Sequence, residues 1–245
     1  MPADTRRARP NRVWWLAFVA ILAVLGVVWG VMAQRPPEAY APAPTASPTP
    51  TPSPTPTIPE IARQQVWRSD TTASGAYLGN TITLEPGISA PEVVPYRVQV
   101  EDTTDLDADA VARQVQATFD DERGWAGYGR RTFKLVTDAD AAKLTIYVVS
   151  PDTTDQLCKP LDTEGLWNCR VGEKVVLNSD RWKYMTPTYD DLDTYRSYLV
   201  NHEVGHFLGQ GHVGCPKKGG PAPVMMQQSI ELGGCLPNAW PRDAD

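Results

Sequence analysis

The sequence has no excess of basic residues and very little histidine. Lys and Arg number 23 against 29 Asp and Glu, and the net charge of the 245 residues is −6. A chain with this balance has no general electrostatic attraction for nucleic acid or acidic lipid, so we expect no nucleic-acid partner. Its three histidines, His202, His206 and His212, all fall within one short segment.

The sequence also lacks the Cys-x-x-Cys pairs that are typical of cysteine zinc sites. Its cysteines are even in number, which favours two disulfides in an oxidising compartment. Three pairings are open in principle, and we predict the local one because it closes two short loops: Cys158 with Cys169, and Cys215 with Cys235. No cysteine is left over to cap a metal ion, so latency through a cysteine ligand is not expected.

One long apolar run, residues 13–33, follows a basic tail of residues 1–12. At about 1.5 Å per residue the run spans roughly 30 Å, the thickness of a hydrocarbon core. We predict a single-pass membrane anchor with a cytoplasmic N-terminus and everything after Ala33 outside the membrane. The alternative is a signal peptide cleaved near Ala33, although the apolar region of such peptides is usually only about 7 to 15 residues long. Both interpretations place the rest of the chain outside the cytoplasm.

The remaining chain divides into a linker and one folded domain. Residues 34–60 are dominated by Pro, Thr, Ala and Ser, which predicts an extended, disordered spacer. Residues 61–245 have mixed patterning, typical of an α+β fold. We predict helices over 107–121 and 191–209, an irregular C-terminal lobe over 211–245, and strands over 93–100, 131–137, 142–150 and 173–178.

The three histidines stand at the spacing of a metal site. His202 and His206 are four residues apart, which places both imidazoles on one face of a helix, about one turn apart. Glu203 lies beside the metal rather than on it, where a carboxylate can accept a proton from metal-bound water. Gly209 lets the helix end and the chain reverse, so that His212 can supply a third nitrogen. Three nitrogens with one open position are typical of catalytic zinc.

Chance is a poor explanation of this pattern. At ordinary residue usage, His-Glu-x-x-His followed by the matching Gly and His arises in roughly one chain in a hundred thousand of this length. Histidines that merely form hydrogen bonds in a core would have to fall at ligand spacing by accident, and here they are all the histidines of the chain. We therefore predict that His202, His206 and His212 bind Zn²⁺ and that Glu203 is the general base.

The segment from His202 to His212 resembles the extended zinc motif His-Glu-x-x-His-x-x-Gly-x-x-His of the metzincin metalloproteases. This resemblance implies a mixed β-sheet with two main helices, the second of which carries the motif, followed by the irregular lobe. It also implies a methionine turn beneath the zinc, for which we choose Met225, with Met226 as the alternative. One departure is that no tyrosine follows Tyr198, whereas some metzincins place a tyrosine near the metal after that turn.

A second resemblance concerns the residues around this motif. The segments 198–202 and 221–225 are similar to those of an uncharacterised family of actinobacterial envelope proteins that share the motif. That resemblance agrees with an exported location and indicates no substrate.

Three functional hypotheses follow. The first is a zinc metalloendopeptidase, a hydrolase of protein or peptide substrates in the cell envelope or extracellular space, in which Glu203 deprotonates a zinc-activated water. The second is a zinc-bearing binding or scaffolding module of the envelope with weak or no catalysis, motivated by the missing tyrosine. The third, hydrolysis of a non-peptide amide in envelope polymers, would use the same activated water.

Overall fold

The computed structural model describes residues 58–244, which belong to one compact unit. The predicted basic tail and membrane anchor, and most of the predicted linker, lie outside the described residues. Within the described part, no helix combines the length and the apolar character that a membrane crossing requires.

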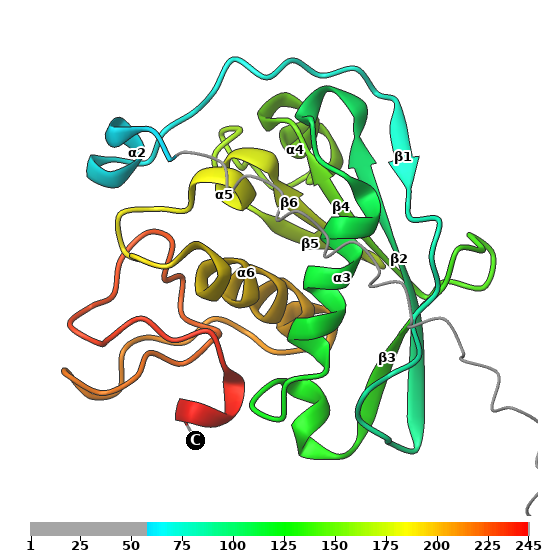
Figure 1. Ribbon diagram of the computed structural model, residues 1–245. Helices are drawn as coiled ribbons and strands as arrows, with labels where there is room; N and C mark the ends of the chain where they lie inside the picture. Colours follow the sequence, from blue (N-terminus) through cyan, green and yellow to red (C-terminus); the bar gives the residue numbers. More distant parts are fainter. Residues whose placement is uncertain (1–57, 245) are drawn as a thin grey trace, which may run out of the picture. The chain divides into compact units, whose positions relative to one another are not determined.

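A mixed six-stranded sheet forms the centre of the described residues (Figure 1). The strands run in the order β1 (Tyr77–Gly79), β2 (Glu92–Glu101), β4 (Leu144–Val149), β6 (Lys174–Asn178) and β5 (Cys169–Val171), and β3 (Arg131–Leu135) also pairs with β2. β2 is parallel to β3 and β4, and β4 is parallel to β6, whereas β1 and β5 are antiparallel to their neighbours. β5 is therefore an antiparallel edge strand.

Two long helices cover one face of this sheet. α3 (Ala108–Phe119) contacts β2 and β3, while α6 (Leu192–Phe207) contacts β5, β6 and α3 (Figure 1). Alternate residues of β2, such as Val94, Tyr96 and Val98, are buried in the core that also contains the buried side chains of both helices. The alternation of period two in the strand and the four-residue spacing in the helix produce these two apolar surfaces.

The second face of the sheet has its own small cluster. Val149 and Val176 are buried there together with the disulfide of Cys158 and Cys169. This disulfide closes the excursion between β4 and β6, which also contains α4 (Pro151–Leu157) and β5. The second disulfide joins Cys215 to Cys235. Both predicted pairings are confirmed.

The predicted α+β class and mixed sheet are confirmed, and so are the four predicted strands and the two predicted helices, with ends that differ by a few residues. The helix predicted over 191–209 is α6, and its outer positions are caps: the Asp191 side chain accepts a hydrogen bond from the Thr194 amide at 2.7 Å, and Gly209 has a φ of +89°. The described residues contain three further α-helices that were not predicted, α2 (Glu60–Gln64), α4 and α5 (Ser179–Tyr184), and the short strands β1 and β5. After α6 the chain is irregular up to a 3-10 turn at Pro241–Ala244, as expected for the C-terminal lobe.

Residues 67–75, which we call the N-terminal strap, precede β1 and form hydrogen bonds with buried side chains of the domain. The Trp67 carbonyl accepts a hydrogen bond from Arg181, a residue of α5 that is fully buried. The Ser69 amide and hydroxyl donate to the Asp180 carboxylate at 2.7 and 2.6 Å. Further along, the Gly75 amide donates to the buried carboxylate of Glu101 at 3.0 Å.

Candidate metal centre

Helix α6 presents two of the three histidines on one face. His202 and His206 are one helical turn apart, and their ring centroids are 4.9 Å apart. His202 is buried, while His206 is partly exposed near the C-terminal end of the helix. The helix therefore places the imidazole of His202 in the protein interior and that of His206 near the surface.

Backbone carbonyls orient both imidazoles. His202 Nδ1 lies 2.8 Å from the Val224 carbonyl oxygen, and His206 Nδ1 lies 2.9 Å from the Gln210 carbonyl oxygen. Because a carbonyl can only accept, each Nδ1 carries the proton and donates it, which leaves the Nε2 lone pair free. Second-sphere bonds of this kind fix the tautomer and ring orientation of metal-binding histidines.

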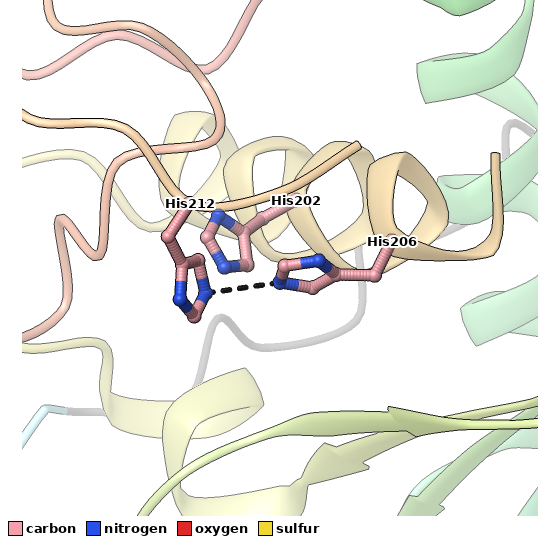
Figure 2. Close-up of side chains that lie close together, drawn as sticks. All are labelled: His202, His206 and His212. Carbon is pink, nitrogen blue, oxygen red and sulfur yellow. Dashed lines mark hydrogen bonds between the residues drawn. The ribbon is translucent and has the colours of Figure 1, made fainter. Parts of the chain in front are cut away.

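The chain reverses after α6, and this brings His212 next to His202 and His206. The Gly209 amide donates to the His206 carbonyl at 3.1 Å and the Gln210 amide donates to the Gly205 carbonyl at 2.9 Å, which closes the helix end. His212 Nε2 then lies 3.0 Å from His206 Nε2, and the ring centroids of His202 and His212 are 5.2 Å apart (Figure 2). The three residues offer ligand atoms that all lie within 4.8 Å of one another, so they can hold one metal ion.

The pKa values of two of these imidazoles are lowered, one in the buried His202 and one in the more exposed His212. Burial, together with the charges that His206 and His212 would carry, lowers the pKa of His202 to about 3, although the hydrogen bond to Val224 opposes this shift. Burial and the neighbouring His206 also lower the pKa of His212. A metal ligand must be unprotonated, so both shifts favour metal binding at neutral pH.

Glu203 directly follows His202 in the sequence and is not one of the three residues whose ligand atoms can hold a metal ion. Its side chain is almost fully buried, and no group in the described part of the chain forms a hydrogen bond with it. Burial raises the pKa of Glu203 to about 8, while the charge of Arg170 acts in the opposite, lowering direction. A carboxylate with a pKa near neutrality, beside a metal site, has the properties of a general base or acid.

A family comparison covers this region. The family model described as "Protein of unknown function (DUF3152)" matches residues 71–236. The chain belongs to this family. Comparisons with curated proteins and with solved structures found no match.

The part of the chain that matches the DUF3152 family contains all six strands, the three histidines, Glu203 and both disulfides. It also contains both methionines that were considered for the methionine turn. A Cβ added to Gly205 of α6 would collide with the Met225 sulfur, so Met225 packs directly against the helix that carries the motif. Met226 instead packs in a separate cluster with the disulfide of Cys215 and Cys235.

A cavity of about 410 Å³ opens onto the three histidines and Glu203. Its walls come from three places: α6, the disulfide-closed segment between β4 and β6, and the C-terminal lobe. Two of the residues that line it are Leu161, which precedes α6 in the sequence, and Ile230, which follows it; these two residues are 51% and 52% exposed. The sequence did not indicate these two wall residues, nor Arg170 and Ser229, which also line the cavity.

Tyr198 is the tyrosine nearest to the motif in the sequence, and its hydroxyl already forms two hydrogen bonds to the backbone. It donates to the Met226 carbonyl at 3.0 Å and accepts from the Gln228 amide at 2.9 Å. Burial raises the pKa of Tyr198 above its ordinary value. This tyrosine therefore supports the C-terminal lobe rather than offering a free hydroxyl to the site.

Proposed function

We propose that this protein is a zinc-dependent metallopeptidase that acts on protein or peptide substrates in the cell envelope or extracellular space. The observation that carries the proposal is the convergence of three imidazoles, two of them oriented by backbone carbonyls, next to Glu203 in an open cavity. The resemblance of His202–His212 to the metzincin motif supplies the step from a metal site to peptide hydrolysis.

Zinc fits this donor set. Zinc–nitrogen bonds are about 2.0 to 2.1 Å long, so two nitrogens at tetrahedral angles on one zinc lie about 3.3 Å apart. The separation of 3.0 Å between the Nε2 atoms of His206 and His212 is close to that value. Three neutral imidazoles leave a fourth position open, which is the arrangement of catalytic rather than structural zinc. When bound there, zinc polarises a carbonyl oxygen and lowers the pKa of water to about 7.

Residues of the chain would supply the other parts of the reaction, which are proton transfer, orientation of the metal-binding histidines and support of the helix. Glu203 accepts a proton from the attacking water and returns it to the leaving amine, which is the general acid–base role its position and environment support. The carbonyls of Val224 and Gln210 hold the rings of His202 and His206, and the turn after α6 brings His212 within reach of the same ion. Met225 packs beneath the helix against Gly205 and holds it in place.

The N-terminal sequence and the disulfides support the proposed location. We propose that residues 13–33 anchor the protein in the cell membrane as a single span, with the N-terminus in the cytoplasm and the catalytic domain outside. Cleavage near Ala33 would instead release it. Two disulfides and no free cysteine among the described residues support an oxidising compartment.

The test is metal content combined with hydrolysis by the full chain purified in detergent. We expect about one zinc per chain, chelator-sensitive cleavage of a peptide library or of envelope proteins, and restoration by added zinc. Glu203→Ala should keep the zinc and lose hydrolysis, whereas His206→Ala should lose both. A wild-type chain that holds no zinc after mild purification would refute the proposal.

The occupied hydroxyl of Tyr198 favours a second candidate, a zinc-bearing binding or scaffolding module with weak or no catalysis. The same experiment separates the two. Full zinc loading without turnover of peptides or envelope extracts would support the module, while release of new amino termini would support the peptidase. Cleavage confined to non-peptide amides of envelope polymers would assign the same site to a different substrate.

A further inference from the structure

Arg170 joins the edge strand of the sheet to the metal centre. It lies in the middle of β5, opposite Val175 of β6, and next to the disulfide-bonded Cys169. Its side chain lines the same cavity as the three histidines and Glu203. Histidines aside, it is the only basic residue among the described residues that line this cavity.

The guanidinium reaches the end of the helix that carries the motif. Arg170 Nη2 donates a hydrogen bond to the His206 carbonyl oxygen at 2.5 Å. The last carbonyls of a helix lack intrahelical donors and carry partial negative charge, so a cation is favourable there. His206 is itself a predicted ligand, so this bond links the backbone of a ligand residue to the wall of the cavity.

Two further features show that the guanidinium is held inward rather than extended into solvent. Its Nε atom is buried and has no hydrogen-bond partner in the described part of the chain. Its charge is also the one that acts on the Glu203 carboxylate. A buried donor without a partner costs stability, and such groups in folded proteins call for an explanation other than packing alone.

We propose that Arg170 is a positioning residue of the metal site. It fixes the last turn of α6 against β5 and so sets where His206 and Glu203 stand relative to the cavity wall. The role deepens the proposed zinc function and rests on it, because it concerns the geometry of that same site. Second-sphere groups that orient ligands typically contribute about 10- to 100-fold to metal affinity or activity.

The test compares three variants of the full chain, with Zn²⁺ alone as the probe. Arg170→Met removes both the donors and the charge, while Arg170→Lys keeps the charge and a flexible ammonium group that can donate. Arg196→Met is the matched control, because Arg196, a residue of α6, likewise donates to a backbone carbonyl, that of Trp182 at 2.8 Å, but does not line the cavity. Zinc affinity is measured by chelator competition, and the absorption spectrum of the cobalt-substituted protein reports ligand geometry.

We expect Arg170→Met to weaken zinc binding by about 10- to 100-fold and to change the cobalt spectrum. Arg170→Lys should recover most of the affinity, and Arg196→Met should match the wild type in both measurements. If peptides are cleaved, Arg170→Met should lower kcat more than it raises KM. If Arg170→Met does not fold, Arg170→Gln replaces it as the uncharged variant with the same expected result.

Two results would overturn the inference. One is wild-type affinity and spectrum in the uncharged Arg170 variant, and the other is an equal loss of affinity in the Arg170 and Arg196 variants, which would indicate general destabilisation of α6. The metal readouts do not depend on turnover. A chain that binds zinc and cleaves nothing refutes the peptidase while the Arg170 comparison still decides this inference, and a wild type that binds no zinc overturns both.

Discussion

At the scale of single residues, burial gives adjacent residues of one helix opposite protonation behaviour. His202 and Glu203 are both almost fully buried, so each disfavours its charged form. The pKa of His202 is lowered to about 3 and the pKa of Glu203 is raised to about 8. The result is a neutral ligand beside a carboxyl group that can take and return a proton.

These shifts predict a two-sided pH dependence of the stability of the metal-free protein. Between about pH 6.5 and 3 the unfolded chain binds a proton at His202 that the folded chain resists, so stability falls as the pH is lowered through that range. Between pH 4.5 and about 8 the folded chain holds a proton on Glu203 that the unfolded chain releases, so stability falls as the pH rises. The two contributions oppose each other between pH 4.5 and 6.5, so urea unfolding of the metal-free chain should show a net loss of stability below pH 4.5 and another above pH 6.5. Glu203→Gln should abolish the alkaline loss. An unchanged alkaline slope in that variant would contradict the assignment.

A second prediction concerns the contact between Gly205 and Met225. Alanine in a helix interior is normally more favourable than glycine by about 0.5 to 1 kcal/mol. Here the added Cβ would collide with the Met225 sulfur and stand 2.9 Å from a Trp125 ring carbon. Gly205→Ala should therefore cost about 1 to 3 kcal/mol of unfolding free energy, the usual range for overpacking. Gly214→Ala is the control, because nothing lies within 4 Å of its Cβ position. Equal stability of the two variants would argue against the contact.

At the scale of elements, the sequence pattern predicted the long helices and strands and the site residues that lie close together in the sequence. β2 and α3 show their periods over ten and twelve residues, so one-dimensional patterning identifies them. β5 and α5 have three and six residues, too few to display a period, and they form because of pairing or packing with distant segments. The same division holds in the site. The spacing of the histidines is local and was readable, whereas Arg170 and the Val224 carbonyl reach the site through contacts 36 and 22 residues away.

Gly209 supplies an element-scale prediction because it ends α6 and starts the return to His212. Its φ of +89° is strained for any residue with a Cβ, although its surroundings leave open space. Gly209→Ala should therefore shift the return segment and weaken zinc binding by chelator competition. Gly211→Ala, whose Cβ position is equally open and whose φ is not in that region, should leave the affinity unchanged. Equal affinities in the two variants would show that the turn tolerates the strain.

At the scale of the whole molecule, each of the two disulfides closes a segment that contributes to the wall of one cavity. Cys169 precedes Arg170 in β5, and Cys215 follows His212 by three residues. A native disulfide typically contributes about 2 to 4 kcal/mol, by a mechanism that includes restriction of the unfolded chain. Both bonds therefore stabilise the fold, but they flank different functional parts.

This division predicts different effects of removing each disulfide. The double variant Cys215→Ser with Cys235→Ser should lose stability and also zinc affinity, because it loosens the segment that carries His212. Cys158→Ser with Cys169→Ser should lose similar stability but lower zinc affinity less than the first double variant, because it loosens the β5 wall, which contacts the site through Arg170 and carries no histidine. Thermal unfolding, zinc competition and peptide turnover together separate the effects. Equal zinc affinity in the two double variants would contradict this assignment of the walls.

The strap at residues 67–75 decides where a soluble fragment of this protein should begin. The family match starts at residue 71, but Arg181 and Asp180 use partners at Trp67 and Ser69. A fragment cut at residue 71 would leave a fully buried guanidinium without its one acceptor and a buried carboxylate without two donors. Each buried donor or acceptor that is left without its partner costs about 1 to 3 kcal/mol, and more when the group is charged. Secreted expression from residue 58 onward should therefore yield folded protein, whereas expression from residue 71 should yield aggregates.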